Sequence, residues 1–342
     1  MKAAIFNPYL DTLGGGERYT LSFAKVLLEK GWDVDIQWED ESIAAKIEKR
    51  FGINTDNLRI VKDVKRGGGY DLSFWVSDGS VPLLFARKNI LHFQVPFRDV
   101  DGRSLINRMK MMRMNHVVCN SNFTKNIIDE EYGTKSIVIY PPVDTESIKP
   151  RRKEKIIIYI GRFSQLVQSK RQDVLVKAFK KLLKNKTIKE WKLILAGGVE
   201  VGVGDYMKKL EKEIKGYPIE IIKSPDFKTV KDLYGRAKIF WSAAGFGTDE
   251  KKNPKKVEHF GITTVEAMSA GAVPIVYKAG GPREIIENAK TGFLWKNEKE
   301  LISLTKELIA DRNLMLNLSN NALVASKRYE YEIFKKKVSE IL

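Results

Sequence analysis

The sequence predicts an α/β protein built from two Rossmann-like, doubly wound domains that face a central cleft. Short β-branched runs alternate with longer amphipathic stretches through most of the chain, which is typical of βαβ units around a parallel sheet. The chain has 342 residues, enough for two domains of about 150 residues, each with its own core. Ligands of such sheets bind at the carboxyl ends of the strands, so function is expected in the loops that follow strands.

One interruption of this alternation sets the expected domain boundary. Pro141 and Pro142 cannot extend a helix or a central strand, and a polar, charged run follows over 144–155. The expected parts are an N-terminal domain, a C-terminal domain and a terminal helix that can cross back to the N-terminal domain, over 1–148, 149–325 and 326–342.

Strands are expected where β-branched and aromatic residues run together. In the N-terminal domain these runs are 3–6, 33–37, 72–76, 90–93, 117–119 and 137–140. A glycine-rich loop over 11–16 follows the first run and leads into a helix expected over 17–30. The C-terminal domain repeats the pattern at 155–160, 193–196, 219–222, 239–241 and 273–276. The last segment, 298–342, is helical in pattern because apolar residues recur at three- and four-residue spacing.

Composition excludes several classes of protein. Hydrophobic residues make up 43% and charged residues 30%, a globular balance that fits neither disorder nor a coiled coil. Lys and Arg number 60 against 43 Asp and Glu, so a net charge of +17 predicts an anionic partner. The single Cys119 predicts a reducing, cytoplasmic compartment. The sequence shows no apolar core of a signal peptide and no apolar run of about 18 residues, so any membrane contact is expected to be peripheral.

Two features suit an anionic ligand. Gly14, Gly15 and Gly16 precede a helix, whose amino terminus offers N–H donors, although a plain tight turn explains them as well. The loop has neither the spacing of a dinucleotide fingerprint nor the Lys of a phosphate-binding Walker loop. In the C-terminal domain, Arg162 follows the first strand and Lys170 precedes the next helix, a pair of cations that suits a diphosphate. A solvated basic face is the alternative for that pair.

The segment Glu258-His259-Phe260-Gly261-Ile262 continues to Glu266 in an expected helix and places a carboxylate on each side of a glycine-containing loop. Carboxylates accept hydrogen bonds from sugar hydroxyls, and the backbone N–H groups of 260–262 complement ligand oxygens at a helix start. As a bare pattern, two glutamates eight residues apart carry little information.

Together these motifs resemble the retaining glycosyltransferases of the GT-B fold, glycosyl transferases group 1. The resemblance covers nearly the whole chain in order and rests on several segments: the glycine-rich first loop, Asn120-Ser121-x-Phe123-Thr124, Tyr140-Pro141-Pro142-Val143-Asp144, Gly161-Arg162 with Lys170, the Glu258-x7-Glu266 string, and Gly280-Gly281 with Glu284. The segments 14–18 and 258–261 are also similar to the branch that elongates lipid-linked oligosaccharides with mannose.

The resemblance implies roles for the C-terminal residues. Arg162 and Lys170 would hold the donor diphosphate and stabilise the departing nucleoside diphosphate. Glu266 would bind the ribose hydroxyls. Glu258 and the backbone of Phe260, Gly261 and Ile262 would hold hydroxyls of the transferred sugar.

For the N-terminal domain, the resemblance implies that Gly15 and Gly16 approach the donor phosphates and that His92 reaches the donor sugar. The loop after His92 has one residue more before Pro96 than is usual in this family, and a structural histidine is the alternative. A second departure is the lysine-rich stretch 243–257, which is expected to be a mobile basic insertion.

The function expected from these motifs is transfer of a sugar, with retention, from a nucleotide-diphosphate sugar such as GDP-mannose or a UDP-sugar to a hydroxyl of a lipid-linked or other glycan acceptor. No metal and no cofactor are expected, because two cations and a helix terminus can stabilise the leaving group. The alternatives are a nucleotide-sugar epimerase or sugar phosphorylase of the same fold. A basic nucleic-acid-binding protein is a remote alternative, since no signature of one is present.

A last segment bears on the membrane. From Arg103 to Met114, four cationic residues alternate with six apolar ones, a pattern that predicts a helix with both cationic and apolar surface. Either one apolar face belongs to the core, or the helix docks on an anionic leaflet at the inner face of the membrane.

Overall fold

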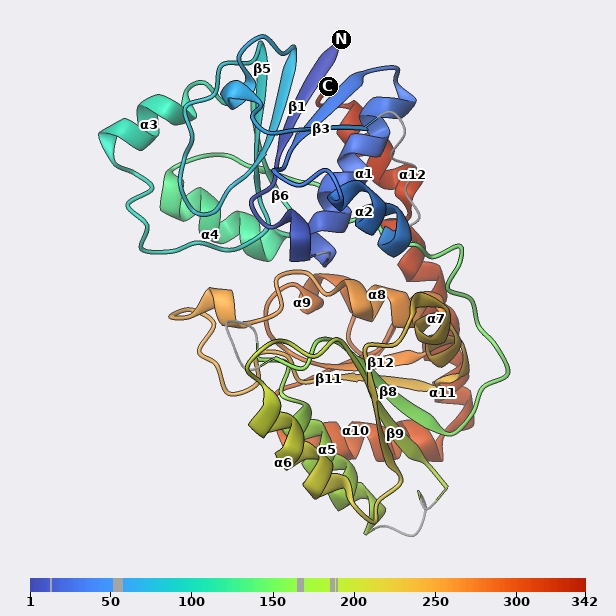
Figure 1. Ribbon diagram of the computed structural model, residues 1–342. Helices are drawn as coiled ribbons and strands as arrows, with labels where there is room; N and C mark the ends of the chain where they lie inside the picture. The colour runs from blue at the N-terminus through green and yellow to red at the C-terminus, as the bar shows by residue number, and fades with distance from the viewer. Residues whose placement is uncertain (13, 52–57, 165–168, 185–187, 189) are drawn as a thin grey trace. The chain divides into compact units, whose positions relative to one another are not determined.

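A computed structural model describes the chain except residues 13, 52–57, 165–168, 185–187 and 189. The described residues form two compact units, each an α/β layer structure around a parallel sheet (Figure 1). The first unit contains Met1–Pro142 together with Tyr331–Leu342, and the second contains Val143–Glu330. The expected fold class of two doubly wound domains is confirmed.

The described part of the first unit has a seven-stranded parallel sheet in the order β3-β2-β1-β4-β5-β6-β7. Its strands are β1 Lys2–Phe6, β2 Asp33–Gln37, β3 Leu58–Val61, β4 Leu72–Val76, β5 Lys88–Phe93, β6 His116–Cys119 and β7 Ile137–Val138. Its helices are α1 Gly15–Glu29, α2 Ile43–Phe51, α3 Leu105–Met111, α4 Asn122–Tyr132 and α12 Tyr331–Ser339.

Alternate residues of the first sheet pack into two separate cores. Ile90 and Val118 belong to the core on the α1 side, whereas their neighbours Leu91 and Val117 belong to the core that contains Ile128 of α4. Successive side chains of a strand point to opposite faces, so this division shows that both faces are covered.

The C-terminal helix α12 is part of the first unit. Phe334, Val338 and Ile341 enter the same core as α1, and the Phe334 ring meets Tyr19 edge to face with 5.1 Å between ring centroids. Lys335 also forms an ion pair with Glu29 at 2.7 Å. The last helix is therefore held by apolar packing along its length.

The second unit has six described strands in the parallel order β10-β9-β8-β11-β12-β13. These are β8 Ile156–Ile160, β9 Lys192–Gly197, β10 Ile219–Lys223, β11 Ile239–Ser242, β12 Val273–Tyr277 and β13 Phe293–Trp295. The helices are α5 Gln172–Leu183, α6 Gly204–Ile214, α7 Phe227–Arg236, α8 Ile262–Ser269, α9 Pro282–Ile285, α10 Glu298–Ala310 and α11 Arg312–Ser326. All five residues of β8 are buried, as expected of a central strand covered on both faces.

Two strands and the unit boundaries differ from the sequence-based expectation. Strands β3 and β13 were not expected, and both are short strands at sheet edges. The units divide after Pro142 and Glu330, whereas boundaries near 148 and 325 were expected. Prolines mark the change of unit itself, and the charged run that follows already belongs to the second unit.

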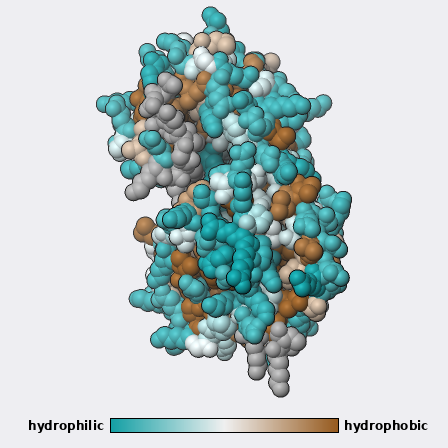
Figure 2. All heavy atoms as spheres, turned by 90° about the vertical axis from the view of Figure 1, so that its right-hand side faces the viewer, coloured by the Kyte–Doolittle hydropathy of each residue, from teal (hydrophilic) through white to brown (hydrophobic). Residues whose placement is uncertain are grey.

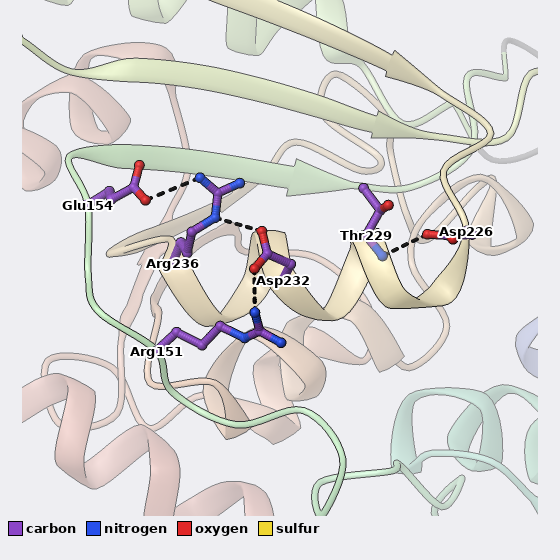
Figure 3. A network of polar contacts seen from close by, with 6 residues as sticks. All are labelled: Arg151, Glu154, Asp226, Thr229, Asp232 and Arg236. Carbon is purple, nitrogen blue, oxygen red and sulfur yellow. Dashed lines mark hydrogen bonds and ion pairs between the residues drawn. The ribbon is translucent and has the colours of Figure 1, made fainter.

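Polar contacts fix the start of the second unit. Arg236 at the end of α7 donates to Asp232 and Glu154, while Asp232 also accepts from Arg151 (Figure 3). Figure 2 shows hydrophilic side chains covering much of one face of the molecule, with apolar residues scattered between them. The side chains of the arginine network are partly exposed, and they tie the segment before β8 to helix α7.

Candidate functional site

The glycine-rich loop is closed by a buried carboxylate. Glu17 is 3% exposed, and its Oε2 accepts hydrogen bonds from the Thr12 hydroxyl and the Gly14 N–H, both at 2.7 Å. Gly14 is the N-cap of α1, so the helix begins with Gly15 and Gly16. The Glu17 carboxylate therefore holds the loop in shape and satisfies the Gly14 N–H at the start of the helix.

Gly16 lies in close contact with a side chain of the first unit, which would have to move if the residue carried a Cβ. A Cβ at this position would lie 2.0 Å from Oε1 of Gln94, which follows β5. The Gln94 backbone is itself fixed, because its carbonyl accepts from Asn120 Nδ2 at 3.0 Å. Sequence reasoning missed Gln94, although its place directly after a strand was a signal.

The structure places His92 away from the surface. Its ring is 0% exposed and stacks on Tyr19, with 4.1 Å between centroids, and on Phe74 at 5.4 Å. Neither ring nitrogen has a partner of normal hydrogen-bond geometry among the described residues. Burial lowers the pKa of His92 to about 3, against an opposing effect of the Val118 backbone, so the ring is neutral. Its expected contact with a donor sugar stays a prediction and requires the ring to leave this stack.

The loop that carries Arg162 in the second unit is packed between the ends of β8 and β9. A Cβ at Gly197 would lie 2.1 Å from the Gly161 carbonyl oxygen, so this approach needs glycine. The Arg162 carbonyl accepts from Gln172 Nε2 at 2.9 Å, and its guanidinium pairs with Glu200 at 3.2 Å. With 55% of its side chain exposed, Arg162 remains accessible to a ligand.

Lys170 and Glu258 meet as an ion pair, although 88 positions separate them in the sequence. Lys170 Nζ lies 2.7 Å from Glu258 Oε2, and the two side chains are 12% and 22% exposed. Burial acts to raise the pKa of Glu258, but Lys170, with smaller contributions from His259 and Arg162, acts in the opposite direction, and together they lower the pKa. The carboxylate is therefore charged and already partnered by the cation expected to bind phosphate.

The turn formed by Gly280 and Gly281 packs against the backbone of Glu258 and holds it in place. The Gly281 N–H donates to the Glu258 carbonyl at 2.9 Å, and a Cβ at Gly280 would lie 2.0 Å from that oxygen. Glu250 holds the turn in place, because its carboxylate accepts from the Gly280 N–H at 2.9 Å and pairs with Arg283 at 2.8 Å. The stretch 243–257 is thus attached to the site by specific contacts, a role that its lysines did not indicate.

Helix α8 begins at the glycine of the Glu258-x7-Glu266 string. Gly261 is the N-cap with a φ of 114°, a conformation that favours glycine, and Ile262 is the first helical residue. The first N–H groups of a helix have no partner within it, so this end can receive ligand oxygens. Phe260, 3% exposed, packs its ring against Tyr329 and anchors the loop before the helix.

Glu266 lies inside α8 and is 6% exposed. Its Oε2 accepts from the hydroxyl of the fully buried Tyr234 at 3.0 Å. Tyr234, a residue that the sequence gave no reason to select, therefore fixes the orientation of this carboxylate.

The second unit brings together two cations, a charged carboxylate and a helix terminus, an arrangement suited to a ligand with both phosphate and hydroxyl groups. Gly15, Gly16 and His92 belong to the first unit. Within the described residues, no group of three or more His, Cys, Asp or Glu is placed to hold a metal ion.

Comparison with known proteins identifies the family. The family Glycosyl transferases group 1 matches residues 143–324, more than half of the chain. The chain belongs to glycosyl transferases group 1. The resemblance to this family that the sequence motifs predicted is confirmed.

Several curated relatives share one name, "GDP-Man:Man(3)GlcNAc(2)-PP-Dol alpha-1,2-mannosyltransferase". The Mus musculus relative is 26% identical over 82% of this chain and 56% of its own length. The Xenopus laevis relative is 30% identical over 52% of this chain and 38% of its own length. An uncharacterized glycosyltransferase of Methanocaldococcus jannaschii is 28% identical over 63% of this chain. The chain thus spans about half the length of the curated relatives that it matches.

Solved structures confirm the GT-B fold. Anabaena HepE in complex with UDP superposes with a TM-score of 0.80 at 18% identity, over 99% of both chains. Sucrose-phosphate synthase of Thermosynechococcus elongatus superposes with a TM-score of 0.77 at 15% identity. In the part of the glycosyltransferase that the structure describes, no helix is both long and apolar enough to cross a membrane.

Proposed function

We propose that this glycosyltransferase moves a sugar from a nucleotide-diphosphate sugar to an acceptor hydroxyl with retention at the anomeric carbon. The observation that carries the proposal is the Lys170–Glu258 pair at 2.7 Å beside the exposed Arg162 guanidinium. This arrangement places a cation that can bind phosphate next to a carboxylate that can accept hydrogen bonds from sugar hydroxyls. A ligand that carries both groups matches it, whereas a phosphate or a sugar alone would satisfy one half.

In the proposed complex, Arg162 and Lys170 bind the diphosphate, Glu266 accepts from the ribose hydroxyls, and Glu258 accepts from hydroxyls of the sugar. The backbone N–H groups of Phe260, Gly261 and Ile262 add donors at the start of α8. Gly15 and Gly16, at the amino terminus of α1, stay predicted phosphate contacts. His92 is left out, because its ring is fully buried.

The proposed reaction breaks the bond between the anomeric carbon and the phosphate oxygen and forms a bond from that carbon to the acceptor oxygen on the same face. The acceptor proton passes to an oxygen of the departing diphosphate. Negative charge grows on that diphosphate, so two fixed cations aimed at it stabilise the transition state more than the ground state. Because these two cations can stabilise the leaving group, we propose that the reaction proceeds without a divalent metal.

GDP-mannose is the first donor to test, because several relatives carry it in their names. A UDP-sugar is the second candidate, supported by the HepE complexes with UDP and UDP-glucose. The relatives' names also support a lipid-linked oligosaccharide as acceptor, with another glycan as the alternative. We propose a cytoplasmic location, which the single free Cys119 supports because a reducing compartment keeps thiols unpaired. We also propose peripheral contact with a membrane, in keeping with a lipid-linked acceptor.

A thermal-shift panel of GDP, UDP and ADP with their sugar conjugates tests the donor, since a ligand that binds only the native state raises its melting temperature. Transfer to a lipid-phosphate-linked oligosaccharide is then followed, with and without a chelator, and NMR gives the anomeric configuration of the product. Isomerisation of the nucleotide-sugar donor without transfer would favour an epimerase. Inversion at the anomeric carbon, or strict dependence on added magnesium, would each contradict the mechanism.

A further inference from the structure

Helix α3 carries apolar side chains that are not used in the core. The helix has no buried residue. Leu105, Ile106 and Met109 are 73%, 66% and 63% exposed, and Met112, the C-cap that continues the helical backbone, is 86% exposed. Burying side chains of this size is worth about 1.5–3 kcal/mol each. Of the apolar residues in this segment, Met111 and Met114 pack against the core, as the core alternative expected, whereas these four do not.

The four exposed residues lie on one face. At about 100° per residue, Leu105, Ile106, Met109 and Met112 fall within an arc of roughly 120° around the helix axis. Arg108 borders this arc on one side and Lys110 on the other. An apolar stripe edged by cations is the pattern of a helix that lies in a membrane interface.

The opposite side of α3 holds the helix to the protein and so fixes which face is outward. Met111 packs against the core that contains Leu91 and Ile128. The Asn107 side chain donates to the Asp101 carbonyl at 3.0 Å, and Ser104 caps the helix by accepting from the Asn107 N–H. The apolar arc therefore points away from the body of the first unit.

Further cations and one more apolar residue extend this surface. Arg103 and Arg113 flank the helix, each with Nε bound to a backbone carbonyl, and the Arg113 guanidinium lies 5.7 Å from the ring centre of Phe85, which is 49% exposed.

Two carboxylates of α4 have partners outside α3. Glu130 pairs with Arg98 at 2.8 Å, and Glu131 accepts the backbone N–H groups of residues 99, 100 and 102. Asp99 and Asp101 remain on the preceding loop, but residues 103–114 contain no acid. The local charge is therefore positive where the apolar side chains project.

Building on the peripheral membrane contact proposed above, we propose that α3, with Phe85 and the four cations of 103–113, is a docking surface for an anionic lipid bilayer, into whose headgroup region Leu105, Ile106, Met109 and Met112 insert. A helix of seven residues is about 10 Å long, so it lies in the interface and does not span the bilayer. A nucleic acid would match the cations but not the large apolar arc between them. A lipid surface provides anionic headgroups and acyl chains together.

Sedimentation with vesicles tests the proposal on the full chain. The wild type should pellet with vesicles of phosphatidylcholine and phosphatidylglycerol at low salt, much less at high salt, and little with phosphatidylcholine alone. Arg108→Glu with Lys110→Glu should weaken binding about fivefold or more for each cation lost. Leu105→Ser with Met109→Ser should also reduce pelleting, because the inserted apolar area is lost.

The matched control is Leu316→Ser with Val324→Ser on α11, which changes two apolar residues that are 58% and 68% exposed and should leave pelleting unchanged. Absence of wild-type pelleting at low salt, or equal pelleting of the α3 variants, would overturn the proposal. So would a dimer that the Leu105→Ser, Met109→Ser change converts to a monomer without any vesicle binding. All variants should keep donor-dependent transfer to a water-soluble acceptor, so a failure of the proposed transfer reaction is visible separately.

Discussion

In the proposed reaction cycle, Lys170 pairs with Glu258 in the free enzyme and binds the diphosphate in the donor complex. Lys170→Ala should abolish most transfer and weaken nucleoside diphosphate binding by about 1.5–3 kcal/mol, the usual range for a hydrogen bond to a charged group. Glu258→Ala should also abolish most transfer while nucleoside diphosphate binding persists, because its proposed contact is to the sugar. Calorimetric titration with nucleoside diphosphate and a transfer assay separate the two effects.

A matched control for this pair exists in the same unit. Lys181 forms an ion pair with Glu298 at 2.7 Å, with 58% of the lysine side chain exposed. Exposed pairs contribute little, so Lys181→Ala should leave binding and transfer near the wild-type values. Wild-type turnover in Lys170→Ala and Glu258→Ala would remove the donor-site assignment.

A substitution of His92 distinguishes a structural role of its ring in the core from a contact with the donor sugar. His92→Phe keeps a flat ring between Tyr19 and Phe74 and removes two buried nitrogens that lack partners of normal geometry among the described residues. The larger ring should lower the free energy of unfolding by about 1–3 kcal/mol. Transfer should persist, as measured alongside a denaturant titration. Loss of transfer with unchanged unfolding would instead give His92 the sugar contact that the family resemblance implied.

At the scale of elements, Glu250 connects the 243–257 stretch to the Gly280-Gly281 turn that contacts the Glu258 backbone. Glu250→Ala removes the acceptor of the Gly280 N–H and the partner of Arg283. The turn should loosen, so hydrogen exchange at 257–261 should rise and transfer should fall without unfolding of the second unit. The partly exposed ion pair limits the stability cost to about 1 kcal/mol.

The neighbouring acid Asp249 provides the comparison for Glu250. Its carboxylate accepts only the backbone N–H groups of Lys251 and Lys252 among the contacts described, within its own loop. Asp249→Asn should therefore leave exchange at 257–261 unchanged. Equal exchange in Glu250→Ala and Asp249→Asn would show that the turn does not depend on Glu250.

At the scale of the whole molecule, the parts that the sequence predicted are those dominated by local burial. Central strands such as β8 are continuous apolar runs, and their positions follow from composition alone. Strand β3 ends in partly exposed residues and β13 has only three, so neither run stands out. The order of site motifs along the chain was also predictable, since each follows a strand.

Contacts between distant segments were not predictable from one sequence. The approach of Gln94 to Gly16, the Tyr234–Glu266 hydrogen bond and the anchoring by Glu250 depend on which loops the fold brings together. The exposure of α3 was likewise not predictable, because methionine and leucine at helical spacing fit a core face and a membrane face equally well. Only the neighbours that the fold supplies distinguish the two.

The two-unit organisation predicts that a change in the last helix destabilises the first unit. Phe334 is 3% exposed in a core formed largely by residues before 140, so Phe334→Ala should cost about 3 kcal/mol or more. The adjacent Ile333, 47% exposed, is the matched control, and Ile333→Ala should cost far less. Hydrogen exchange followed by peptide should show faster exchange throughout 1–142 in Phe334→Ala and an unchanged pattern over 143–330. Faster exchange confined to 143–330 would mean that α12 stabilises the second unit, and no change anywhere would mean that α12 is dispensable. The expected result follows because apolar contacts, and not position along the chain, decide which unit a helix stabilises.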